Sequence, residues 1–132
     1  MTACERSADN GGSKVRVYTQ VYAPLEQKIL TATVRDPSFQ ALAQVIRLAP
    51  VEDVEASAAK QGTAPPYRWS VPTLVVHNAT DAACADSLAQ LFQWTYGVKA
   101  NVRPLPAKLK KQPGVVEFWV PPGGTMPATP AS

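Results

Sequence analysis

The sequence has few of the residues on which metal and redox centres depend. It contains two cysteines and one histidine in 132 residues, and Cys4 and Cys84 stand too far apart to form a Cys-x-x-Cys pair. Clusters of these residues at short spacing are the usual sign of a zinc site or a disulfide framework. We therefore expect no metal, no cofactor and no disulfide framework, with Cys4 in a loose terminal segment and Cys84 as a small buried apolar residue.

Long apolar runs are also missing. No stretch approaches the roughly 20 apolar residues that cross a bilayer, so we predict no membrane span. No transit peptide is visible. The formal net charge of +3 is only mildly basic, which permits contact with nucleic acid but does not require it.

No candidate catalytic group has suitable neighbours. His77 is the only histidine and has no acidic residue or second histidine at metal-ligand spacing, so we interpret it as structural or as a surface residue. Glu52, Asp53 and Glu55 form an acidic cluster that is typical of a solvated face. No Gly-rich phosphate loop is present. The sequence predicts no catalytic, cofactor-binding or metal-binding residue.

The residues that are present suit one folded domain, because 132 residues of which 45% are hydrophobic can bury one core. Alternation predicts a strand at 14–19, Pro24 opens a helix that ends before Pro37, and Pro72 leads a strand that reaches His77. The segment 43–48 is favoured as a strand, with a short helix around 39–46 as the alternative. Residues 51–60 are a short helix or a structured loop. A helix with an apolar face then ends near Gly97; the predicted face comprises Leu88, Leu91, Phe92, Thr95 and Tyr96.

Both ends of the chain are expected to be extended. Residues 1–13 have no periodicity and are predicted to form a flexible arm. Prolines concentrate in the last third, so residues 98–132 are predicted to form a basic, Pro-rich arm. The apolar run 115–120 is either a strand at the sheet edge or an arm that docks on a neighbour. The predicted partner-binding residues all lie in this arm: Lys99, Arg103, Lys108, Lys110, Lys111, Phe118 and Trp119.

The domain between the arms, residues 14–97, resembles the thioredoxin-like fold and most closely its glutaredoxin and glutathione-transferase branch. The resemblance rests on residues 15–28 and 71–96. It implies an α/β domain with a mixed four-stranded sheet flanked by helices, a short strand before the last helix, a cis peptide before Pro72, and Asp86-Ser87 at the position that grips glutathione. The catalytic cysteine or serine would fall at Ala23, which has no nucleophile. Thiol chemistry is therefore not expected.

Within that fold, the chain resembles the mitochondrial large-ribosomal-subunit protein of the L-fifty-three family. The opening strand residues 13–17, the helix exit at 36–38 and the apolar strand and turn at 72–78 match this family. The connection 51–64 is longer than in the family, and the C-terminal arm carries no family motif. The thioredoxin-like accessory subunit of respiratory complex I is a second family with this fold.

This resemblance implies a noncatalytic structural subunit of a large mitochondrial assembly. The first expectation is the ribosomal large subunit in the mitochondrial matrix, with the basic arm contacting rRNA and neighbouring proteins and with no small-molecule substrate. An accessory subunit of complex I or of ATP synthase is one alternative. The other is a glutathione-binding enzyme of the glutaredoxin or transferase type, in which Tyr18 or Tyr22 would activate glutathione.

Overall fold

A computed structural model describes residues 4, 14–33, 35–37, 46–64, 67–112 and 114–123 of the chain. The predicted flexible arm at residues 1–13 lies outside this part except for Cys4. In the described part, no helix has the length and apolar character needed to cross a membrane. The elements in chain order are β1 (Val15–Val21), α2 (Pro24–Thr33), β2 (Ile46–Leu48), β3 (Glu52–Asp53), α4 (Val54–Gln61), β4 (Thr73–Val76), the 3₁₀ turn η2 (Ala79–Asp81), α5 (Ala82–Tyr96), β5 (Asn101–Pro104) and β6 (Val115–Val120).

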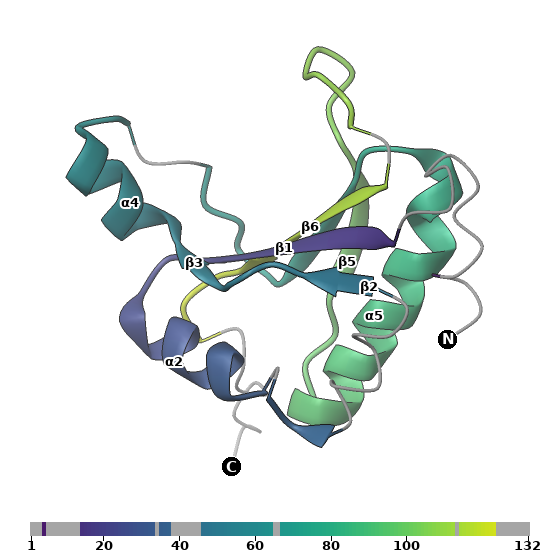
Figure 1. Cartoon of the computed structure of the whole chain (residues 1–132), viewed down its shortest axis with the longest axis horizontal. Coiled ribbons are helices and arrows are strands. Elements are labelled where there is room, and N and C mark those ends of the chain that lie inside the picture. Colours follow the sequence, from purple (N-terminus) through teal and green to yellow (C-terminus); the bar gives the residue numbers. More distant parts are fainter. Residues whose placement is uncertain are drawn as a thin grey trace.

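The strands form one mixed sheet in the order β2-β1-β6-β4-β5, with β3 continuing beside β1 (Figure 1). β1 runs parallel to β2, β3 and β6, whereas β4 runs antiparallel to β6 and parallel to β5. Two of these parallel pairs join consecutive strands with one helix between them, α2 between β1 and β2 and α5 between β4 and β5. The predicted α/β class with a mixed sheet is confirmed, but the sheet has six strands and not four.

The predicted C-terminal arm is wrong, because it contains two strands of the sheet. β6 pairs with β1 along six residues and with β4 along four, so it lies at the centre of the sheet and not at an edge. The prolines that suggested an arm stand at strand ends: Pro104 is the last residue of β5 and Pro121 directly follows β6. Proline is tolerated there because it has no N–H to donate to a strand ladder.

Several elements lie where the sequence predicts them. α2 begins at Pro24 and ends at Thr33, well before Pro37, and β4 follows Pro72 directly. α5 ends at Gly97, which adopts a left-handed φ of 71° and whose N–H donates to the Gln93 carbonyl at 2.7 Å. This is the conformation that glycine adopts at helix ends without steric cost. Residues 46–48 form a strand, as favoured; residues 39–45 lie outside the described part.

The second half departs from the predicted thioredoxin-like order. Residues 79–81 form a 3₁₀ turn where a short strand was expected, so α5 follows β4 without a hairpin. The strand between β1 and β4 is β6, from the far end of the chain. The described residues contain no cis peptide, so the expected cis bond before Pro72 is also wrong. Short-range patterns cannot reveal that a distant strand enters the centre of a sheet.

The two faces of the sheet differ. Side chains alternate between faces along a strand, so Val17, Leu74, Val116 and Phe118 point to one face, the helix face, against which α2 and α5 pack. The opposite face is called the open face here and carries Tyr18, Gln20, Val75, His77, Glu117 and Trp119. In Figure 1, α2 and α5 lie on the lower side of the sheet, whereas α4 and the loop after β5 rise above it.

A disulfide joins Cys4 to Cys84 in the first turn of α5. Both cysteines are buried, and Cys84 belongs to the core cluster on the helix face. The expectation that Cys4 lies in a loose segment is therefore wrong. A separation of 80 residues carries no spacing signal, so the pair becomes visible only when the fold brings the two residues together.

Candidate partner-binding face

The loop that joins β5 to β6 is fixed at both of its ends. Residues 105–112 are called the lysine loop here. At its start the Leu105 N–H donates to the Val76 carbonyl at 2.8 Å, and at its end the Gln112 N–H donates to His77 Nδ1 at 3.0 Å. Figure 1 shows this loop projecting from the sheet. Its position is therefore set by β4, against which both ends are hydrogen-bonded.

The tip of the lysine loop is cationic and exposed. Lys108, Lys110 and Lys111 are exposed, and residues 105–112 contain no acidic residue. Leu109 between them is 50% exposed, and its N–H donates to the Pro106 carbonyl at 3.0 Å to close a turn. Lysines in this arrangement attract phosphate groups without reading base sequence.

His77 holds this loop and uses both of its ring nitrogens in hydrogen bonds. Because Nδ1 accepts the Gln112 N–H, Nε2 carries the proton and donates to Glu117 Oε2 at 2.6 Å. The other carboxylate oxygen, Oε1, accepts the Trp119 indole N–H at 2.9 Å. The imidazole is only 5% exposed. With both ring nitrogens engaged, it has no lone pair to offer a metal or a substrate proton.

An aromatic cluster lies at the other end of the open face. It is defined by Tyr22, Tyr67, Trp69 and Trp119, together with Arg68. The Tyr67 and Trp69 rings meet edge to face with centroids 5.0 Å apart, and Tyr22 lies 6.0 Å from Trp119. The guanidinium carbon of Arg68 stands 5.3 Å from the centre of the Tyr22 ring, within cation–π range. Tyr67 is 72% exposed.

Tyr22 organises this cluster from below. Its hydroxyl donates to the Tyr67 carbonyl at 2.6 Å and accepts the Trp69 N–H at 3.3 Å. The buried Tyr22 side chain therefore holds the backbone of both Tyr67 and Trp69. Burial raises the pKa of Tyr22 above its usual 10.0, although the Trp69 N–H and the Arg68 charge oppose this. Arg68 also forms an ion pair with Glu55, which ties α4 to the cluster.

The seven predicted partner-binding residues do not form one surface. Lys108, Lys110 and Lys111 share the lysine loop, and Arg103 is exposed on the edge strand β5. Lys99 lies before β5, at the opposite end of that strand from the loop. Phe118 and Trp119 lie on opposite faces of the sheet, because adjacent side chains on a strand point to opposite faces.

Phe118 points into the helix face, where its ring meets Phe92 edge to face at 4.9 Å, whereas Trp119 lies on the open face. Phe118 is therefore a packing residue and not an exposed contact residue. The prediction rested on an exposed arm, whereas adjacent side chains on a strand point to opposite faces of the sheet.

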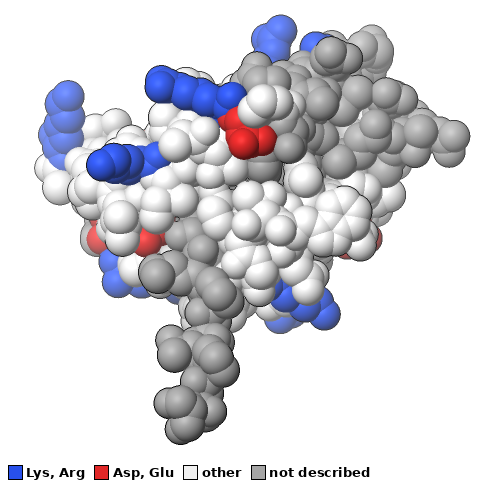
Figure 2. All heavy atoms as spheres, turned by 90° about the horizontal axis from the view of Figure 1, so that it is seen from below, with Lys and Arg blue, Asp and Glu red and all other residues white. Residues whose placement is uncertain are grey.

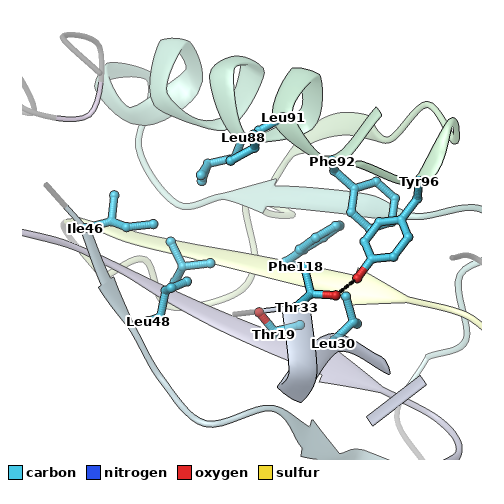
Figure 3. Close-up of a pocket in the computed structure, with 11 residues that line it drawn as sticks. Thr19, Leu30, Thr33, Ile46, Leu48, Leu88, Leu91, Phe92, Tyr96 and Phe118 are labelled. Atoms are coloured by element: carbon cyan, nitrogen blue, oxygen red, sulfur yellow. Dashed lines mark hydrogen bonds between the residues drawn. The ribbon is translucent and has the colours of Figure 1, made fainter. Parts of the chain in front are cut away.

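The helix face offers only a small cavity. Its volume is about 40 Å³, and it lies between α2, α5 and the sheet (Figure 3). Ten of its lining residues are labelled in Figure 3, where the Tyr96 hydroxyl meets the Thr33 hydroxyl across the two helices. The lining is almost wholly apolar, and the Thr33 and Tyr96 hydroxyls bond to each other, so the cavity has few polar groups that could orient a ligand.

The outer surface on the helix side has its charged side chains distributed differently from those of the lysine loop. Figure 2 views the molecule from this side, and outside the grey atoms most Lys and Arg side chains stand toward the rim around an uncharged middle. No cation-rich loop like residues 105–112 is concentrated there.

The glutathione site implied by the thioredoxin resemblance is not assembled. Ala23 follows β1, and Pro72 precedes the antiparallel β4, so both lie at one end of the sheet. α5 begins after the end of β4, which places Asp86 and Ser87 in its second turn toward the other end. Within the described part of the chain, no group of three His, Cys, Asp or Glu residues is arranged to hold a metal ion.

The aromatic cluster was missed in the sequence. Tyr67, Arg68 and Trp69 follow Pro65-Pro66, and none of the three is among the predicted partner-binding residues. The available signal was two aromatic residues at i and i+2 around an arginine, outside any predicted apolar face. Aromatic residues and arginine together are the composition most enriched in binding hot spots.

No known protein-family model matches the chain, and no curated protein or solved structure shows significant similarity to it. The function must therefore be inferred from the geometry of the two faces.

Proposed function

We propose that this protein is a noncatalytic binding subunit that docks on RNA through the lysine loop. The observation that carries the proposal is the double anchoring of this loop, by Val76 at its start and His77 at its end. A loop that is already ordered loses less conformational entropy on binding than a free tail. Lys108, Lys110 and Lys111 then supply positive charge at a fixed place.

The engaged state of the reactive side chains supports a noncatalytic role. Cys4 and Cys84 are joined in a buried disulfide, so neither offers a thiolate. His77 uses both ring nitrogens in hydrogen bonds. The position of the thioredoxin-type nucleophile holds Ala23. The glutathione-enzyme alternative finds no support in these positions.

The mitochondrial large ribosomal subunit is the assembly suggested by residues 13–17, 36–38 and 72–78, and the matrix is the location that goes with it. A thioredoxin-like origin is supported by the β1-α2-β2 unit and by the proline-led β4, while the placement of β6 argues against it. Buried disulfides are typical of oxidising compartments, so the Cys4–Cys84 bond argues against the matrix. An accessory subunit of a respiratory complex has no additional support in the structure.

RNA binding is tested by fluorescence anisotropy with a labelled 20-nucleotide single strand and with a duplex of equal length. Replacing Lys110 and Lys111 with alanine should weaken both affinities by roughly tenfold near 0.1 M salt, because two phosphate contacts are lost. The control variant Lys28→Ala/Arg35→Ala removes the same charge from exposed positions on and just after α2. Equal losses in the two variants, or no binding by the unaltered protein, would refute the proposal.

A further inference from the structure

We propose that the open face binds single-stranded RNA, with bases stacked on Tyr67 and Trp69 while the backbone runs to the lysine loop. The inference rests on the proposed function and adds the kind of RNA that is bound. Exposed aromatic rings beside cations are the combination by which proteins hold single strands, since every base offers a face for stacking.

The two rings are available and already positioned. Tyr67 is 72% exposed and Trp69 is partly exposed, and they meet edge to face. Their backbones are held by the Tyr22 hydroxyl, which contacts the Tyr67 carbonyl and the Trp69 N–H. The rings therefore form a platform whose order does not depend on the ligand, which reduces the entropy lost on binding.

The carboxylates nearest the cluster are hydrogen-bonded or ion-paired within the protein, although Glu117 keeps its negative charge because both of its donors are neutral. Both oxygens of Glu117 accept hydrogen bonds, from His77 and Trp119, and Glu55 is paired with Arg68. Glu52 is exposed in β3, where it pairs with Gln20 of β1, and Gln20 separates it from Trp119. The charges left facing solvent beside the path to the loop include Arg103 on β5. A phosphate backbone thus meets more positive than negative charge along this face.

The aromatic cluster and the lysine loop lie at opposite ends of β4. Residues 67–69 precede this strand, and the loop begins next to its last residue, Val76. Four strand residues cover about 13 Å, a distance that a flexible single strand of a few nucleotides can bridge. In a duplex the bases are paired inside and cannot reach the two rings. The arrangement therefore favours single-stranded over double-stranded RNA.

The test compares three variants by anisotropy with a 12-nucleotide oligouridine strand and with a duplex of equal length. Tyr67→Ala/Trp69→Ala should weaken single-strand binding by at least about five- to 150-fold, which is the range for losing one stacked base, and leave duplex binding unchanged. Lys110→Ala/Lys111→Ala should weaken both. Trp94→Ala is the matched control, since Trp94 is 75% exposed but lies on α5, away from the open face.

The outcomes separate the two proposals. Unchanged single-strand affinity in Tyr67→Ala/Trp69→Ala, with a loss in the lysine variant, overturns stacking and leaves the proposed function standing. Absence of any RNA binding overturns both and makes the cluster a surface for protein partners. A second measurement avoids the risk of misfolding: oligouridine should quench tryptophan fluorescence in Trp94→Phe, which retains Trp69 and Trp119. Quenching that disappears in Trp94→Phe would also overturn the inference.

Discussion

Phe118 and Trp119 are neighbours on β6 and show how differently the two faces of the sheet are built. Phe118 lies on the helix face and packs against Phe92, whereas Trp119 lies on the open face and donates to Glu117. The helix face buries aliphatic and aromatic side chains under two helices. The open face combines hydrogen-bonded polar groups with exposed rings and a projecting loop. Stability is thus expected to depend mainly on one face, and recognition on the other.

Removal of the last 35 residues should have the largest effect. Deleting residues 98–132 removes β5 and β6, and with β6 the only strand that joins β1 to β4 in the described sheet. The β1-α2-β2 unit and the remaining β4-α5 segment then have no strand that joins them, so we expect no cooperative folding. Circular dichroism and thermal unfolding measure this directly. A truncated protein that unfolds cooperatively would show that β6 is dispensable and that the sheet assignment is wrong.

Phe92→Ala should cost about 3–5 kcal/mol in the free energy of unfolding, because its buried ring fills the space between α5 and the sheet. Trp94→Ala on the same helix removes a larger but exposed ring and should cost less than about 0.5 kcal/mol. Urea unfolding of the two variants gives both values. Similar losses in the two would contradict the assignment of Phe92 to the core on the helix face.

Loss of the disulfide should lower stability by about 2–4 kcal/mol, because the Cys4–Cys84 link closes a long loop in the unfolded chain. Unfolding of Cys4→Ala/Cys84→Ala, with and without reducing agent, is the measurement. Reducing agent should destabilise the unaltered protein under unfolding conditions and leave the variant unchanged. If the unaltered protein responds no more than the variant, the disulfide does not contribute to the fold.

The smallest effect is expected at alkaline pH. Burial raises the pKa of Tyr22 and Tyr96 above the ordinary 10.0, so the folded protein keeps these protons to higher pH than the unfolded chain. Their contribution to stability is therefore complete below about pH 10 and is lost as pH rises through the folded pKa values. Tyr22→Phe/Tyr96→Phe should flatten this decline in urea unfolding between about pH 8 and 11. If the stability of the variant falls as steeply with pH, titrating groups other than Tyr22 and Tyr96 cause the decline.

Local patterns predicted the elements but not their neighbours. Pro24, Pro72 and Gly97 mark element ends through their own backbone preferences, and these positions were predicted correctly. The central place of β6 and the Cys4–Cys84 bond depend on contacts between distant parts of the chain, which periodicity does not encode. For this reason the predicted arm and the predicted exposure of Phe118 were wrong.

The candidate site was predicted only in part, because some of its residues are close in sequence and others meet only through the fold. Lysines at 108, 110 and 111 are close in sequence, so their charge could be recognised without a fold. Their anchoring by His77 could not, because His77 lies 35 residues before Gln112 and meets it only through the sheet. The aromatic cluster likewise joins residues from β1, β6 and the segment before β4.

The salt dependence of single-strand RNA binding tests the central claim most directly. Log affinity should fall linearly with log salt concentration, and the slope should become shallower by about 1.4 in Lys110→Ala/Lys111→Ala, since each phosphate contact on a single strand contributes about 0.7. Lys28→Ala/Arg35→Ala should keep the slope of the unaltered protein. An equal slope in all three proteins would contradict the account, because the lysine loop would then make no contact with phosphate.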